Sequence, residues 1–107
     1  MNQPTNLEIN FHDAMVQIYL REKAECGLNA ARFLQMVANE GGLSTSKKLL
    51  AAAQPAEGFA ALWEMKRLDL TVEFLVLRPE YKSLFNAQEL ATARNRLIEY
   101  GYPESDL

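Results

Sequence analysis

The sequence predicts an all-α protein, a compact orthogonal bundle of five to six short helices. Apolar residues recur at helical spacing through most of the chain, and residues that favour helix ends separate these segments. Of the 107 residues, 49% are hydrophobic and 23% are charged, a balance that lets one hydrophobic core close. We therefore expect a single helical domain over residues 11–102, a flexible arm over residues 1–10 and an acidic tail over residues 103–107.

The first two predicted helices are joined by a short link at Gly27, which we expect to end the first helix. That helix spans about residues 12–26, and its outer face carries charged residues that include Glu22, which we expect to face solvent. Asn29 is the expected N-cap of the second helix, and Gly41 and Gly42 are its expected end. The apolar residues that place both helices on the core are Phe11, Met15, Ile18, Tyr19, Ala30, Phe33, Leu34 and Val37.

Two further helices are predicted on either side of Pro55, which ends the first of them. The earlier helix has capping oxygens available from Ser44, Thr45 and Ser46. The later helix covers about residues 56–67 and carries Phe59, Leu62 and Trp63 on one stripe. Gly58 lies in its first turn, where glycine costs up to ~1 kcal/mol relative to alanine, so we expect a close packing contact there.

The segment of residues 68–77 fits two patterns. From Leu68 to Phe74, apolar and polar residues alternate as in a half-buried strand. With Asp69 as N-cap, the apolar residues of the same segment also recur at helical spacing. A strand here would find no partner strand elsewhere in the chain, so we expect a helix.

The last predicted helix has the clearest start signal in the chain. Pro79 breaks the preceding helix, and Asn86 followed three residues later by Glu89 matches a capping box. Gly101 is the expected end. Its apolar face consists of Leu90, Ala93, Leu97 and Tyr100.

Side chains suited to catalysis are scarce. The chain has one histidine, His12, and one cysteine, Cys26, and on one helix their fourteen-residue separation corresponds to about 21 Å. The pair therefore cannot form a catalytic dyad within that helix, and a zinc site would have to recruit carboxylates as further ligands. No glycine-rich phosphate loop is present, because Gly41 and Gly42 lack the required spacing and lysine. We predict a protein that is not an enzyme, with no catalytic residues, cofactor or metal, in which replacing His12 by alanine changes only stability.

Charge and hydropathy predict the compartment. A net charge of −3 and a pI near 5.1 disfavour non-specific binding to nucleic acid or to anionic membranes. The chain has no run of about 18 apolar residues, and its first residues lack the pattern of a secretory signal. A lone cysteine agrees with a reducing environment. We expect a cytoplasmic protein that does not contact membranes.

The aromatic residues indicate a protein partner. Tyrosine and tryptophan combine a large apolar surface with a hydrogen-bonding group, which makes them effective interface anchors. The alternative is that these side chains only extend from the core toward solvent. The candidate partner-binding residues are Tyr19, Trp63, Tyr81, Tyr100 and Tyr102.

A second hypothesis is DNA binding. The helices on either side of Pro55 could form a helix-turn-helix, with Lys47, Lys48, Lys66 and Arg67 contacting phosphates. Against this, the second helix carries acidic residues such as Glu64 where a recognition helix presents Arg, Asn, Gln or Ser to base edges. Protein recognition is the less demanding interpretation.

Four segments carry a resemblance: Ala31–Val37, Gly42–Leu50, the GFxxLWExxRLDLTVE-type stretch Gly58–Glu73, and Ala93–Leu97. Together they resemble a recurrent bacterial family of small uncharacterised helical proteins, over roughly residues 11–102. That family has no assigned activity. The resemblance implies a bacterial, cytosolic, compact helical domain, and no functional residue is carried over from it.

These observations lead to one main expectation of function. We expect a small accessory or regulatory protein that binds another protein, with DNA binding as the alternative. Two-fold assemblies are common, so a homodimer that buries the first or the last helix is also expected.

Overall fold

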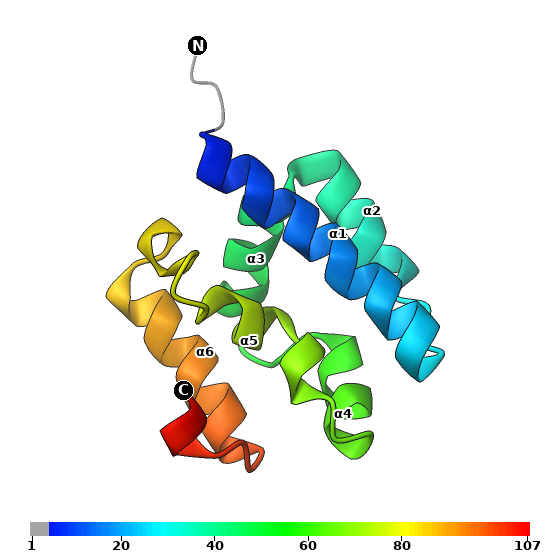
Figure 1. Ribbon diagram of the computed structural model, residues 1–107, viewed down its shortest axis with the longest axis vertical. Coiled ribbons are helices and arrows are strands. Elements are labelled where there is room, and N and C mark those ends of the chain that lie inside the picture. Colours follow the sequence, from blue (N-terminus) through cyan, green and yellow to red (C-terminus); the bar gives the residue numbers. More distant parts are fainter. Residues whose placement is uncertain (1–4) are drawn as a thin grey trace.

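The longest helix, α1 (Asn6–Cys26), lies along one side of the molecule in the computed structural model, which describes residues 5–107 (Figure 1). The Thr5 side chain caps α1 by accepting a hydrogen bond from the Glu8 N–H. The predicted arm over residues 1–10 is therefore wrong from Asn6 onward, because the cap at Thr5 starts the helix two turns earlier than the apolar pattern does. Residues 1–4 of that arm lie outside the described residues. At the other end Gly27 adopts φ 67°, which confirms it as the end of α1.

Six α-helices and three short 3₁₀ segments make up residues 5–107, with no strand among them, so the predicted all-α bundle is confirmed. Helices α1, α2 and α3 pack against one another, and α3 and α5 connect them to α6 on the far side (Figure 1). Helix α4 packs mainly against the 3₁₀ segment η1. After α1 the elements are α2 (Ala31–Glu40), α3 (Gly42–Ala51), α4 (Glu57–Glu64), η1 (Leu68–Leu70), α5 (Val72–Val76), η2 (Lys82–Leu84), α6 (Ala87–Glu99) and η3 (Glu104–Asp106).

The predicted caps of α2 and α3 are wrong. Ala30 occupies the N-cap position of α2 without a side-chain hydrogen bond, while the Asn29 side chain instead accepts a hydrogen bond from the Tyr19 hydroxyl at 3.0 Å. Helix α3 begins at Gly42, directly after α2, so Thr45 and Ser46 lie inside the helix and are fully buried. Helix packing against α1 and α2 overrides the capping preference of these hydroxyl residues.

The segment after α4 is helical, as predicted, but it is broken in two. The 3₁₀ segment η1 comes first, and Thr71 then caps α5 by accepting a hydrogen bond from the Phe74 N–H at 3.1 Å. Thr71, rather than the predicted Asp69, is thus the N-cap of α5. The Asp69 carboxylate is engaged by the Arg67 side chain instead.

The capping box that opens α6 is confirmed. The Asn86 side chain accepts from the Glu89 N–H at 2.8 Å, and the Glu89 side chain accepts from the Asn86 N–H at 2.9 Å. Beyond α6 the predicted acidic tail folds back into η3. There Glu104 pairs with Arg94 at 3.1 Å and Leu107 packs on the apolar cluster around Leu97.

The core has two parts. The larger part joins α1, α2, α3, α5 and α6 around the fully buried Phe11 and Met15. The smaller part lies under α4 and η1 and consists of Phe59, Leu68 and Leu97. Over residues 5–107, no helix is both long enough and apolar enough to cross a bilayer.

Candidate functional site

Three of the five predicted partner-binding aromatics gather at one place, where the end of α4 meets the end of α6. The Tyr100 ring packs edge to face against Trp63, with ring centroids 5.5 Å apart, and against the buried Phe59, with centroids 4.9 Å apart. Tyr102 packs on Phe74 at 5.5 Å. We call the outward side of this group the Trp63 surface, made up of Trp63, Met65, Lys66, Asp69, Tyr100 and Tyr102.

The Trp63 surface is apolar and hollowed. Trp63 is 45% exposed and Met65 46% exposed, although both are large apolar side chains. A hollow of about 420 Å³ lies beside Trp63 and is lined by Leu68, Tyr100, Tyr102 and Pro103. Burial, together with the negative charges of Asp106 and Asp69, raises the pKa of the Tyr102 hydroxyl.

Lys66, at the rim of this hollow, adopts an unusual backbone conformation. Its φ is 60°, in the left-handed region that residues with a Cβ rarely adopt. Around it the Arg67 N–H donates to the Leu62 carbonyl at 2.8 Å, which closes the end of α4 in the way a C-terminal glycine usually does. A strained residue that is not glycine therefore lies at the edge of the Trp63 surface.

The other two predicted aromatics lie elsewhere. Tyr19 is buried on α1, and its hydroxyl donates to Asn29. Tyr81 packs edge to face on Phe11 in the main core, at 5.3 Å between ring centroids. Both serve the core, which is the alternative that the sequence left open for all five residues.

Three of the four basic residues of the DNA hypothesis are paired with carboxylates within the chain. Lys47 pairs with Glu89 at 2.8 Å and lies over the Phe85 ring, Lys48 pairs with Glu40, and Arg67 pairs with both Glu25 and Asp69. Lys66 lies at the Trp63 surface. Helices α3 and α4 are not among the closely packed helix pairs, so they do not form the compact unit of a helix-turn-helix.

His12 has a structural contact. Its Nδ1 accepts a hydrogen bond from the Gly42 N–H, 2.9 Å away, at the start of α3. Cys26 is a free thiol at the end of α1. In the described part of the chain, no three His, Cys, Asp or Glu side chains come close enough together to hold a metal ion.

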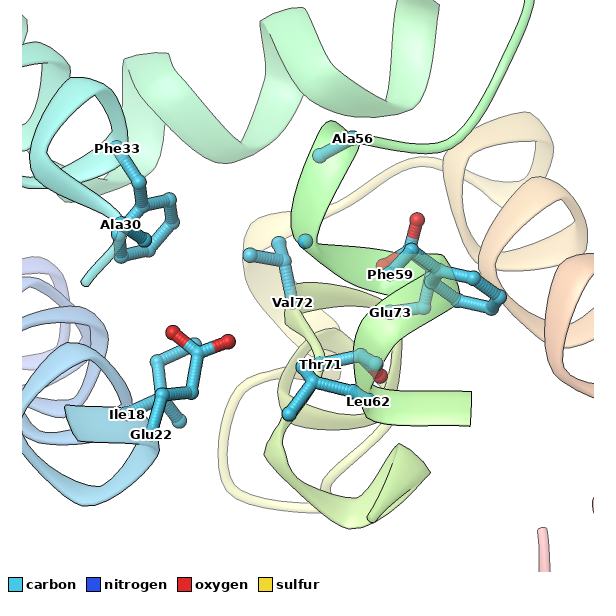
Figure 2. Close-up of a pocket in the computed structure, with 11 residues that line it drawn as sticks. Ile18, Glu22, Ala30, Phe33, Ala56, Phe59, Leu62, Thr71, Val72 and Glu73 are labelled. Atoms are coloured by element: carbon cyan, nitrogen blue, oxygen red, sulfur yellow. The ribbon is translucent and has the colours of Figure 1, made fainter. Parts of the chain in front are cut away.

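Glu22 is the polar residue that the sequence misplaced. The predicted solvent-facing position is wrong, because Glu22 is only 7% exposed and lines the space between α1, α2, α4 and α5. Figure 2 shows its carboxylate leaving α1 on the side where Phe33 and Val72 lie. Burial raises the pKa of Glu22 from its ordinary value of 4.5 to about 7.

Two connected hollows surround this carboxylate, and we call them together the Glu22 pocket. The inner chamber has a volume of about 50 Å³ and the outer hollow about 560 Å³. Glu22, Ala30, Phe33, Ala56 and Gly58 line both, which makes the two hollows one continuous site. No sequence signal marks this pocket, because Glu22 stands between Arg21 and Lys23 in a run typical of an exposed helix face.

A second buried glutamate, Glu73, lies beside the inner chamber but is already paired. Its carboxylate accepts a hydrogen bond from Arg96 Nη1 at 3.1 Å, and Arg96 also donates to the carbonyls of Leu49 and Ala52 at the end of α3. Burial raises the pKa of Glu73, and the hydrogen bond and charge of Arg96 oppose that rise. Through these contacts, Arg96 of α6 links α5 to the end of α3.

Comparisons of the chain with models of protein families, with curated proteins and with solved structures found no match. The resemblance to a bacterial family of small helical proteins therefore stays a prediction.

Proposed function

We propose that this chain is a small accessory or regulatory protein that binds another protein, and that the partner binds at the Trp63 surface. The observation that carries this proposal is that Trp63 stays 45% exposed while Tyr100 packs against its ring edge to face. An aromatic side chain positioned in this way loses little conformational freedom on binding, which is what makes tryptophan and tyrosine strong interface anchors.

The surroundings of Trp63 support the same function. Met65 adds exposed apolar area, and the adjacent hollow of about 420 Å³ can receive a side chain of the partner. Lys66 and Asp69 supply a polar rim of the kind that surrounds the apolar centre of an interface. DNA binding has less support, because three of its four basic residues are already paired with carboxylates.

Position-specific crosslinking in cells of the source organism tests this proposal. A photo-crosslinking amino acid at position 63 should capture a discrete partner protein. The matched control is position 20, because Leu20 on α1 is 46% exposed and lies away from the Trp63 surface. The same crosslinked species at both positions, or none at either, would contradict the proposal.

The recovered partner then allows a direct measurement. Trp63 is the chain's one tryptophan, so its fluorescence reports on this surface alone. Adding the partner should shift the emission to shorter wavelength and protect it from iodide quenching. We expect Trp63→Ala to raise the Kd by about tenfold or more, while Leu20→Ala leaves it unchanged.

A further inference from the structure

The Glu22 pocket has the size and lining of a small-molecule site. Its outer hollow of about 560 Å³ falls within the range of roughly 300–1,000 Å³ that is common for such sites. Most of the residues around it are apolar, and they come from three helices and the links between them. They include Leu28, Phe33, Met36, Leu49 and Ala61.

The carboxylate of Glu22 is the buried polar group of this lining that lacks a partner, whereas Arg32 is exposed at its rim. Glu22 is only 7% exposed, and no described residue donates a hydrogen bond to its carboxylate, since burial is the one cause that shifts its pKa. Burying an ionised carboxylate without a partner is costly in free energy, and the group responds by shifting its pKa toward the neutral form. The rise in the pKa of Glu22 to about 7 is that response.

The other polar side chains of the inner chamber are already satisfied. The Thr71 hydroxyl donates to the Leu68 carbonyl and accepts from the Phe74 N–H. Glu73 is paired with Arg96. A molecule in the chamber therefore meets one free polar group, Glu22, surrounded by apolar side chains.

We propose that the Glu22 pocket binds a small organic amine, with its ammonium group paired to the Glu22 carboxylate and its apolar body against Phe33, Leu49 and Met36. A cation that donates hydrogen bonds supplies what the buried carboxylate lacks. An anion would be repelled by Glu22. A metal ion would lack ligands, because no group of three candidate ligand residues exists in the described part of the chain.

This site is separate from the Trp63 surface, although α4 contributes to both. Gly58 and Ala61 of α4 line the Glu22 pocket, whereas Trp63 lines the other hollow. Arg32 lies at the rim of the outer hollow, so the positive charge of a ligand has to pass it to reach Glu22. The ammonium group therefore binds in the inner part of the pocket, and the apolar body fills the outer hollow.

Titration of the isotope-labelled chain by NMR and by calorimetry tests the proposal. The probes are phenethylamine, its neutral analogue phenethyl alcohol, and phenylpropionate as the anion. At about pH 8, where Glu22 is ionised, the amine should bind saturably and at least about tenfold more tightly than the alcohol, and the anion should not bind. Chemical-shift changes should centre on Ile18, Glu22, Phe33 and Val72.

Variants of the pocket locate the binding site and separate the contribution of the Glu22 charge from that of the pocket's shape. Glu22→Gln should weaken amine binding by about tenfold or more and leave alcohol binding unchanged. Ala30→Leu, which fills the space shared by the two hollows, should weaken both. The matched control is Glu64→Gln, an exposed glutamate on α4 that should change neither.

Three results would overturn the proposal. One is equal binding of amine and alcohol, and another is amine binding that survives Glu22→Gln or Ala30→Leu. The third is no saturable binding of phenethylamine up to about 10 mM, which is weaker than the useful range for a specific site. Because glutamine removes a costly buried charge, Glu22→Gln should fold normally, and its NMR spectrum checks this.

Discussion

His12 and Gly42 bring α1 and α3 into direct backbone contact. The Gly42 N–H donates to His12 Nδ1 at 2.9 Å, which satisfies the first amide of α3 in place of a conventional N-cap side chain. A Cβ on Gly42 would lie 2.7 Å from the Cα of His12. Glycine is therefore required at position 42 by the closeness of the two helices, and the one histidine of the chain completes that contact.

Gly42→Ala should destabilise the protein by about 1–3 kcal/mol, because the new methyl group overlaps the backbone of α1 and the helices must separate. Urea denaturation measures the change in the free energy of unfolding. Gly58→Ala is the matched control, since a Cβ there meets no atom within 4 Å and alanine is favoured in a helix by up to ~1 kcal/mol. Equal losses in both variants would show that the close contact has no energetic role.

Arg96→Met should destabilise the protein by about 3–5 kcal/mol. Arg96 is 8% exposed, and its loss leaves the Glu73 carboxylate buried without its partner and two carbonyls at the end of α3 without the Arg96 donors. Arg94→Met is the control, because the Arg94 pair with Glu104 is exposed and contributes only about 0–1 kcal/mol. A loss no larger than that of the control would mean that the hydrogen bonds of Arg96 add no net stability.

The stability of the protein should fall as the pH rises from about 4.5 to about 7, in part because of Glu22. Its pKa is higher in the folded state than in the unfolded state, so the folded state binds the proton more tightly in this interval and loses that advantage as the pH passes 7. Glu22→Gln removes the titration. The variant should therefore be more stable than the natural chain by roughly 2–3 kcal/mol above pH 7 and should lose this difference near pH 4.5.

Urea denaturation across this pH range measures how the titration of Glu22 changes the free energy of unfolding. The comparison with Glu22→Gln also isolates it from Glu73, whose pKa is raised in both proteins. Glu64→Gln, at an exposed position, should show no such pH-dependent difference. A difference between the natural chain and Glu22→Gln that is constant with pH would contradict the assignment.

Lys66→Gly should stabilise the protein by about 1 kcal/mol. The φ of 60° at Lys66 costs an ordinary residue roughly 1–2 kcal/mol, and glycine adopts it without strain. The same substitution at Lys23, inside α1, should instead destabilise by about 1 kcal/mol. Thermal denaturation of both variants gives the two signs, and a loss of stability at position 66 would show that the Lys66 side chain is needed there.

The fold class could be predicted from the sequence because helical periodicity and strong caps are local signals. The capping box at Asn86 and the glycine end at Gly27 depend on a few neighbouring residues, and the structure has both. The expectation of a close contact at Gly58 was wrong, since the crowded glycine is Gly42. Neighbouring residues mark neither glycine as crowded, and only the approach of α1, with His12 30 residues from Gly42, decides between them.

The Trp63 surface and the Glu22 pocket also differ in how far the sequence could predict them. Trp63, Tyr100 and Tyr102 could be predicted as candidate interface residues, although the sequence did not separate them from Tyr19 and Tyr81, which pack in the core. The Glu22 pocket could not be predicted, because Glu22 is covered by α4 and α5, which follow it by more than thirty residues. The sequence around Glu22 has the charge pattern of an exposed helix face, and tertiary packing reverses that expectation.

Helix α3 is fastened at both of its ends by side chains from distant parts of the chain. His12 of α1 accepts from its first amide, and Arg96 of α6 donates to carbonyls at its last turn. Neither α1 nor α6 can detach without releasing one end of α3, so the two sides of the bundle are linked into a single cooperative unit. The amide hydrogens of α3 should therefore exchange with solvent only when the whole molecule unfolds, at the slowest rate in the protein.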